Sequence, residues 1–416
     1  MRQSKLFLKT YKEFPSDEIS QNAKFLIKAG FIDKLSSGVY NLLPLGFLVI
    51  EKIKNIIRRE LNLLGCQELL LANLHLRKYW EKTDRWNKFD VLFKIKGNLE
   101  EYALAPTHEE VIFPLIKKTV FSYKQLPLAL YQINTKYRDE LRAKSGLLRN
   151  REFIMKDLYS FHINNNDLEK FKKKIEEAYL KIFNKIGLKP IKTLASGGTF
   201  SEFSTEFQVL TESGEDIIYL CSNCNLSWNK EIIKREKCEY CDKNLEIYKS
   251  IEIANTFNLG TKFSDIFDVF YLDKKNKKNF IWAGCYGIGI TRILGAIAEI
   301  YNDKKGLIWP ESISPFKVHL ILLFTGDNKK NLSLYRIAEN LYNKLSFYNI
   351  DTLFDDRHNV SNGEKLSESD LIGITYKIII GERFLKNKKV ELIFRKNGKI
   401  KELKIQEVVN FFKDKK

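Results

Sequence analysis

The strongest constraint on the fold of this 416-residue chain is a basic β-hairpin followed far downstream by a glycine-spaced run. Residues 129–137 and 152–161 are rich in β-branched and aromatic side chains, which favours two strands. Several arginines lie where these strands are joined, and the run GCYGIGITR at 284–292 opens a predicted helix. Arginine pairs bidentately with phosphate oxygens, so the hairpin suits an ATP-activating site. The alternatives are a solvated basic surface and glycines that serve only as turn devices.

The remaining pattern predicts helices and strands on both sides of the hairpin. Apolar periodicity favours helices at 18–30, 45–64 and 167–186. Another helix is expected from Thr107, with Glu110 completing a capping box. Short strands are expected at 67–74, 207–210, 265–272 and 280–283. From residue 317 strands and helices alternate, which predicts an α/β domain with a mostly parallel sheet.

The net charge is +18, from 70 basic and 52 acidic residues. Such a surplus suits a polyanionic partner such as a nucleic acid, although a compositional bias toward lysine explains it equally well. No stretch reaches the roughly 18–20 apolar residues of a membrane span, and residues 1–13 lack an apolar signal region. We therefore expect a cytoplasmic protein with no membrane partner.

Four of the six cysteines form two CxxC pairs, Cys221/Cys224 and Cys238/Cys241. Without a secretion signal a disulfide framework is disfavoured, and two such pairs place four thiolates around one tetrahedral ion. We expect a structural Zn²⁺, because all four positions are closed. Iron, a redox pair and chance spacing are the alternatives.

The hairpin and the glycine run together resemble two motifs of class II aminoacyl-tRNA synthetases. Arg138-x-Glu140 followed by Arg149-x-x-x-Phe153 is similar to motif 2, and Gly287-x-Gly289-x-x-Arg292 is similar to motif 3. The resemblance implies an antiparallel sheet that holds ATP in a bent form. It assigns Arg138 to the α-phosphate, Glu140 to the adenine edge, Phe153 to stacking on adenine and Arg292 to the γ-phosphate, with Arg149 and the two glycines also in the nucleotide site.

The finer pattern resembles bacterial prolyl-tRNA synthetases over nearly the whole chain. The stretch Pro106-Thr107-His108-Glu109-Glu110 matches that family's Thr-x-Glu loop, and further matches include TKYRDE at 135–140 and REFIMKDLYSFH at 151–162. The resemblance implies that Thr107 and Glu109 bind the imino group of proline. It places the other proline-binding side chains at Arg138, Met155, Asp157, Tyr159, Phe207 and Cys285. Methionine and phenylalanine are also ordinary core residues.

The C-terminal region resembles the anticodon-binding domain of class IIa synthetases through Asp355-Asp356-Arg357 and the LIGI run at 371–374. Anticodon bases are splayed and read by hydrogen bonds and stacking, and Arg357, Glu364 and Lys365 are the candidates here. Solvated charges in loops are the alternative interpretation. The resemblance implies tRNA(Pro) and L-proline as partners and a homodimer.

The chain departs from the family pattern in three places. Only about forty residues separate Asp216 from the LGTKFS run at 259–264, too few for the large editing domain of many bacterial members. We therefore expect no editing of Ala-tRNA(Pro) by this chain, and a separate trans-editing protein is an expected partner. The proline that usually ends motif 1 is Ala72, and the histidine that often precedes the Glu-Phe-Gln run is Thr205.

The sequence thus predicts an α+β catalytic domain with an antiparallel sheet flanked by helices, over 1–216 and 253–311. A four-cysteine zinc ribbon is inserted at 217–252, and an α/β anticodon-binding domain follows at 312–416. The expected reaction is ATP-dependent activation of proline, with Mg²⁺ on the phosphates. The rivals are a threonine or glycine synthetase, a non-catalytic paralogue and an ATP-binding module without tRNA. Arg138, Glu140, Phe153 and Arg292 are all present, which disfavours a damaged paralogue.

Overall fold

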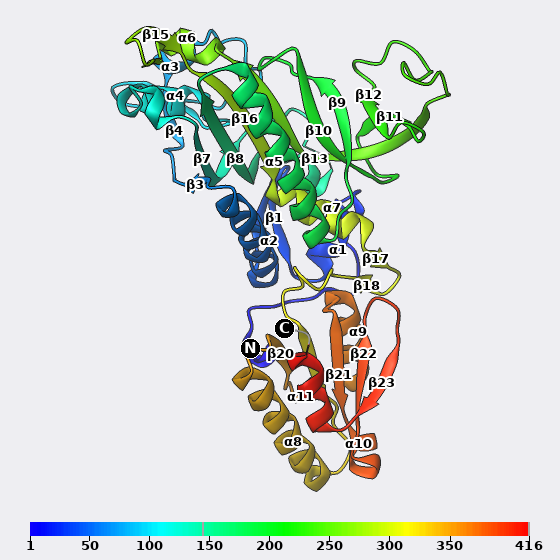
Figure 1. Ribbon diagram of the computed structural model, residues 1–416. Helices are drawn as coiled ribbons and strands as arrows, with labels where there is room; N and C mark the ends of the chain where they lie inside the picture. Colours follow the sequence, from blue (N-terminus) through cyan, green and yellow to red (C-terminus); the bar gives the residue numbers. More distant parts are fainter. Residues whose placement is uncertain (144, 415–416) are drawn as a thin grey trace. The chain divides into compact units, whose positions relative to one another are not determined.

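The computed structural model describes residues 1–143 and 145–414, which form two compact units. One unit contains Leu35–Tyr40 and Ile53–Ala296, and the other contains Met1–Lys34, Asn41–Lys52 and Ile297–Lys416. Figure 1 shows the elements of each unit.

The first unit is built on a sheet with strand order β10-β9-β12-β11-β13-β16-β8-β7-β3. Strands β7, β8, β16 and β13 are antiparallel neighbours, and the expected hairpin of β7 and β8 lies between β16 and the edge strand β3. Strand β10 also pairs with β13, which closes a ring through β9, β12 and β11. The strand bounds are β3 Gln67–Glu68, β7 Leu128–Tyr137, β8 Glu152–His162, β9 Ile191–Ser196, β10 Phe203–Leu210, β11 Asp216–Cys221, β12 Leu226–Asn229, β13 Glu246–Gly260 and β16 Trp282–Gly289.

Helix α5 (Asn165–Ile186) covers one face of this sheet (Figure 1). It begins at the cap Asn164, whose side chain accepts a hydrogen bond from Asp167 N, and it ends at Gly187 with φ +100°. Its apolar positions are buried at helical spacing, among them Tyr179 and Phe183. On the other face α4 (Glu109–Thr119) and α6 (Lys262–Phe267) pack with Tyr159 and Cys285 in one apolar cluster.

Shorter elements complete this unit. They are α3 (Arg77–Lys82), η2 (Tyr123–Gln125), η3 (Gly146–Leu148), a small sheet of β4 (Leu74–Leu76), β6 (Glu101–Leu104) and β5 (Lys94–Lys96), and the pair β14 (Phe270–Leu272) and β15 (Lys278–Phe280). Elements that continue from one unit into the other are β1 (Ile32–Ser36), β2 (Val39–Leu42), α2 (Pro44–Leu63) and α7 (Ile290–Ile300).

The second unit contains a sheet with strand order β20-β19-β21-β22-β23 and one main apolar cluster. Its elements are η1 (Gln3–Lys5), α1 (Gln21–Lys28), β17 (Asn302–Asp303), β18 (Gly306–Leu307), β19 (Val318–Leu322), α8 (Asn328–Phe347), β20 (Thr352–Asp355), α9 (Asn362–Ile372), β21 (Tyr376–Ile380), α10 (Glu382–Asn387), β22 (Val390–Phe394), β23 (Ile400–Leu403) and α11 (Ile405–Lys413).

The sequence predicted a mostly parallel sheet here, and this prediction is wrong in part. Strand β19 runs parallel to β20 and β21, but β22 and β23 are antiparallel to their neighbours. The chain reverses between β22 and β23 at Gly398, whose φ of +67° suits a tight turn. Strand β23 and helix α10 were not expected, because short exposed elements leave a weak periodic signal.

Two strand predictions in the first unit were wrong in part. Within 67–76 only Gln67–Glu68 and Leu74–Leu76 are strands. Between them, at Leu71, side-chain amides take the place of backbone-to-backbone hydrogen bonds. Gln132 Oε1 accepts from Leu71 N at 3.0 Å, and Asn134 Nδ2 donates to Leu71 O at 3.0 Å. Within 265–272 the chain completes α6 and becomes a strand only at Phe270. Short apolar runs do not distinguish a helix turn from a strand.

Candidate active site

A pocket lies between the β7–β8 hairpin, β13 and the start of α7, with an empty volume of about 530 Å³. Its lining includes the predicted nucleotide residues other than Gly287. The lining residues are Arg138, Glu140, Leu147, Leu148, Arg149, Asn150, Phe153, Met155, Glu252, Ile253, Ala254, Asn255, Gly289 and Arg292. The structure therefore brings residues of both motifs, which are separated by more than a hundred positions, to one cavity.

Arg138 lines this pocket and directly follows the last residue of β7. Its guanidinium carbon lies 5.2 Å from the Phe153 ring centroid, and its Nη2 donates to Pro106 O at 3.4 Å. Its Nε is buried with no hydrogen-bond partner in the described part of the chain. Burial lowers the pKa of Arg138, and the positive charge of Arg292 lowers it further. Two cations that repel each other across a cavity favour the binding of a polyanion between them.

Arg292 is held on the opposite side of the pocket by three oxygens. Its Nε donates to Leu148 O at 2.9 Å, and its Nη1 donates to Glu252 O at 2.9 Å and to Glu252 Oε2 at 3.1 Å. The neighbouring Thr291 Oγ1 accepts from Ile154 N at 2.9 Å, which joins the start of α7 to β8. The helix start therefore fixes the arginine against the hairpin.

Gly287 is required by a close approach. A Cβ at this position would lie 2.7 Å from Asn255 Oδ1 and 2.9 Å from Met155 Cε. A side chain there would push aside the ends of the Asn255 and Met155 side chains, which both line the pocket. At the rim, Arg149 Nε lies 3.3 Å from Glu215 Oε2, and both side chains are partly exposed.

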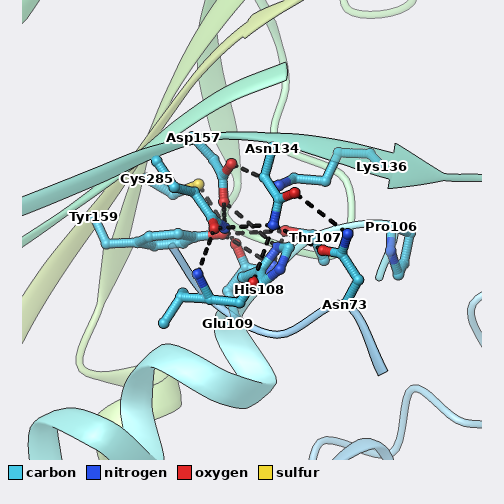
Figure 2. Close-up of polar contacts among 12 residues, drawn as sticks. Asn73, Pro106, Thr107, His108, Glu109, Asn134, Lys136, Asp157, Tyr159 and Cys285 are labelled. Carbon is cyan, nitrogen blue, oxygen red and sulfur yellow. Dashed lines mark hydrogen bonds and ion pairs between the residues drawn. The ribbon is translucent and has the colours of Figure 1, made fainter. Parts of the chain in front are cut away.

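Thr107, Glu109, Tyr159 and Cys285 form a second, buried group on the same face of the sheet (Figure 2). Thr107 Oγ1 donates to Glu109 Oε2 at 2.5 Å, and Cys285 Sγ donates to Glu109 Oε1 at 3.4 Å. Tyr159 OH accepts from His108 N at 3.0 Å. The structure thus brings together four of the predicted proline-binding residues around one carboxylate.

The capping box predicted at Thr107 is wrong. Helix α4 begins at Glu109, its N-cap is His108, and no side chain caps it. The Thr107 hydroxyl instead bonds to the Glu109 carboxylate. A threonine that could cap the helix is used to orient an anion.

Asp157 lies beside this group in a polar network that the sequence did not reveal. Its Oδ1 is 2.7 Å from Lys136 Nζ, its Oδ2 accepts from Gln132 Nε2 at 2.9 Å, and its Oδ2 is 3.6 Å from His108 Nδ1 (Figure 2). Burial raises the pKa of Asp157, but the charge of Lys136 and the hydrogen bonds from Lys136 and Gln132 oppose this, and the pKa is lower than its ordinary value. Alternation along β7 places Gln132, Asn134, Lys136 and Arg138 on one face, and this alternation was the available signal.

Two predicted proline residues lie elsewhere. Met155 lies next to Gly287 and lines the pocket that contains Arg138 and Arg292. Phe207 is fully buried with its ring 5.3 Å from that of Tyr179 and 5.8 Å from that of Phe183, both on α5. The expectation that Phe207 lines the proline pocket is therefore wrong: it packs on the face covered by α5, near a bulge between Phe207 and Gln208.

The four paired cysteines converge at the end of β11, and their sulfurs all lie within 4.8 Å of one another. Cys221 Sγ and Cys241 Sγ are 3.5 Å apart. Four sulfurs at about 2.3 Å from a tetrahedral Zn²⁺ are separated by about 3.8 Å, so this cluster fits such an ion.

The predicted anticodon residues have different environments. Arg357 is held by Asp355, with Nη2–Oδ2 at 2.7 Å, and by Glu368 at 2.5 Å. Glu364 is exposed in the first turn of α9. Lys365 is fully buried and donates to Leu322 O at 2.8 Å. The prediction that Lys365 contacts a base is therefore wrong, because its ammonium is buried and bonds to a backbone carbonyl inside this unit.

Two family matches cover most of the chain. Residues 92–301 match the tRNA synthetase class II core domain (G, H, P, S and T), and residues 318–415 match the anticodon binding domain. The fold and the site therefore define a class II aminoacyl-tRNA synthetase. Among residues 1–143 and 145–414, no helix combines the length and apolar content that a membrane span requires.

The relatives give the particular family. The chain is 36% identical over 432 residues to a proline–tRNA ligase of Ehrlichia ruminantium (strain Gardel), which covers 99% of this chain and 100% of the relative. The chain belongs to the proline–tRNA ligase family. It is also 31% identical over 565 positions to the proline–tRNA ligase of Persephonella marina (strain DSM 14350 / EX-H1), with 99% of each covered. That alignment is longer than this chain, so the relative holds a long segment with no counterpart here.

A solved structure supports the fold. Giardia lamblia prolyl-tRNA synthetase in complex with prolyl-adenylate superposes with a TM-score of 0.79 and is 23% identical. The match covers 94% of this chain and 75% of that chain.

Proposed function

We propose that this chain activates L-proline with ATP and transfers the prolyl group to tRNA(Pro). The observation that carries this proposal is the full-length match to a proline–tRNA ligase. The arrangement of the site agrees with it, because a two-arginine pocket and a buried carboxylate share one face of the sheet. Loading of labelled proline onto tRNA(Pro) in the presence of ATP tests the proposal, and tRNA that stays unlabelled would contradict it.

The first step joins proline to the α-phosphate. A carboxylate oxygen of proline attacks the α-phosphorus, a new P–O bond forms, and the bond to pyrophosphate breaks with its electron pair leaving on pyrophosphate. The carboxylate is already ionised near neutral pH, so this step needs no general base. Arg138 and Arg292 stabilise the charge that develops on the phosphate oxygens. The terminal ribose hydroxyl of tRNA then attacks the prolyl carbonyl, loses its proton and expels AMP.

Proline would bind through its imino cation. In this proposal the Glu109 carboxylate accepts from that cation, and Thr107 Oγ1 and Cys285 Sγ hold the carboxylate in place. Tyr159 and the Lys136–Asp157 pair form the surrounding wall. A charge-assisted hydrogen bond to a buried carboxylate is stronger than a neutral one, so this contact would contribute much of the affinity.

Two metals belong to the proposal. Among the lining residues of the nucleotide pocket, Glu252 carries a carboxylate that fits Mg²⁺, an ion that prefers oxygen ligands, while Glu140 would face the adenine edge. Mg²⁺ would neutralise the β- and γ-phosphates when bound. Zn²⁺ would be held by Cys221, Cys224, Cys238 and Cys241 and would have a structural role, since four thiolates leave no open position.

The second unit would bind the anticodon loop, with Arg357 and Glu364 as the remaining candidate contacts. Glu364 is exposed and Arg357 is half-buried, so both can be reached from solvent. We also propose a homodimer, as the family resemblance implies.

Editing gives a further prediction. Alanine carries an amine and a carboxylate, as proline does, and lacks only the contacts of the apolar ring, which distinguish the two by only about 1–3 kcal/mol, so some Ala-tRNA(Pro) should form. The region 217–252 is occupied by β11, β12, the cysteine cluster and the start of β13, which leaves no room for a hydrolytic domain. Preformed Ala-tRNA(Pro) should therefore decay at the same rate with the protein as in buffer alone.

The decay is followed by the loss of labelled alanine from the tRNA. Pro-tRNA(Pro) under the same conditions is the control for non-specific hydrolysis. Alanine release well above both backgrounds would reveal an editing site in this chain and remove the need for a separate trans-editing protein.

A further inference from the structure

A buried arginine outside both motifs shares one nitrogen between two carboxylates of α4. Arg85 Nη1 lies 2.9 Å from Glu110 Oε1 and 3.4 Å from Glu109 Oε2. Thr83 Oγ1 also donates to Glu110 Oε1 at 2.9 Å. All three charged side chains are buried, and Arg85 Nε and Nη2 have no hydrogen-bond partner in the described part of the chain. The arginine is therefore committed to this pair of carboxylates.

Aromatic rings close off the arginine from water. Its guanidinium carbon lies 4.7 Å from the ring centroid of Phe89, 4.8 Å from that of Phe200, 5.2 Å from that of Trp80 and 5.8 Å from that of Phe263. Without solvent to screen them, the charges of this cluster must be balanced by one another or by a ligand.

The neighbouring histidine, tyrosine and cysteine side chains add no charge to this cluster. Burial lowers the pKa of His108 to about 2 and that of His75 to about 4, so both are neutral. Burial raises the pKa of Tyr159 and of Cys285 well above their usual values, so they are neutral too. Arg138 also acts on Glu109, but it lines the pocket where the proposed function assigns it to the α-phosphate. The other two charges form a balanced pair.

That pair is Lys136 and Asp157, at 2.7 Å. One arginine thus faces two carboxylates, and the cluster of Arg85, Glu109 and Glu110 carries one uncompensated negative charge when both carboxyls are ionised. The imino cation of proline supplies the missing positive charge.

We propose that Glu110 is a positioning residue that neutralises Arg85, so that the charge of Glu109 is kept for the imino cation of proline. This inference rests on the proposed function, in which Glu109 binds that cation. In addition, Arg85 competes with the imino cation of proline for the Glu109 carboxylate. Glu110 weakens this competition, because Arg85 lies closer to Glu110 than to Glu109.

A pH dependence follows from this arrangement. Burial raises the pKa of Glu110 to about 7; Arg85 opposes the shift and Glu109 adds to it. When Glu110 is protonated, Arg85 is balanced by Glu109 alone and proline meets a neutral cluster. Bound proline favours ionised Glu110, so binding below that pKa releases a proton. Proline affinity should fall as pH falls through about 7.

Calorimetric titration of the full chain with L-proline tests this, in buffers of different ionisation enthalpy, which count the protons released. The wild-type affinity should fall about tenfold between about pH 8 and about pH 6, with a proton released at the lower pH. Glu110→Gln should bind proline at least about tenfold more weakly at about pH 8 and show no pH dependence. The double variant Arg85→Met with Glu110→Gln removes the competitor as well, so it should recover affinity without regaining the pH dependence.

Two further variants separate the possible causes. Glu176→Gln is the matched control, because Glu176 is also a buried carboxylate but bonds to Thr256 and Lys192 on α5's side of the sheet. It should behave as the wild type. Glu109→Gln tests the proposed function: unchanged proline binding in that variant would remove the proposed role of Glu109. Loss of binding in Glu109→Gln with wild-type affinity and pH dependence in Glu110→Gln would overturn the inference alone.

Discussion

Replacing Arg138 or Arg292 by alanine should slow proline-dependent ATP–pyrophosphate exchange by about 10²-fold or more. Each guanidinium borders the same pocket, and each would contact charge that grows on the phosphates in the transition state. Because such contacts are stronger in the transition state than in the ground state, the loss should appear mainly in kcat.

The two variants should differ in stability. Arg138 has one long hydrogen bond to Pro106 O, so its removal should leave the fold intact. Arg292 joins Leu148 and Glu252, so its removal should lower the unfolding temperature modestly. Arg383→Ala is the control, since Arg383 is exposed and pairs with Glu391 far from the pocket in sequence. A folded variant of Arg138 or Arg292 with near wild-type exchange would show that its motif assignment is wrong.

Loss of the metal should have the second large effect. Structural Zn²⁺ contributes apparent binding free energies of about 10–16 kcal/mol, and that energy becomes folding energy where no preformed site exists. The four cysteines join β11 to the start of β13, and few apolar side chains are buried between them. Elemental analysis should find about one zinc per chain in the wild type and none in Cys221→Ser.

Limited proteolysis should then cut Cys221→Ser within 221–245, while the wild type resists. Cys66→Ala is the matched control, because Cys66 is buried but belongs to no cysteine cluster in the described part of the chain. It should keep the metal and the resistance. A wild-type protein that contains no metal and still resists the protease in this segment would contradict the zinc assignment.

The structure brings the predicted nucleotide residues other than Gly287 to one pocket, because their positions follow local rules. The alternation of β7 and β8 and the glycine run before α7 each fix a side-chain direction, and the strand pairing of β8 with β16 brings Arg138 and Arg292 to one cavity. Other side chains take a direction that a tertiary feature decides, and their places could not be predicted from the sequence. A bulge beside Phe207 and the burial of Lys365 leave no trace in the local pattern.

Arg85 is a residue whose importance the sequence alone did not reveal. It belongs to no motif, and nothing in the residues around it distinguishes it from a solvated surface arginine. Its role becomes visible only when α4 brings Glu109 and Glu110 to within 3.4 Å of its guanidinium. Charged residues that act on one another across the fold are therefore the part of a site that a single sequence predicts least well.

The proposed function requires that this site activate proline in preference to every other amino acid. Amino-acid-dependent exchange of labelled pyrophosphate into ATP, measured with each of the twenty amino acids in turn, tests it most directly. Proline should stimulate exchange far above the others, with alanine a weak second because it is smaller and lacks only the contacts of the apolar ring. Equal or greater stimulation by threonine or glycine would contradict the account.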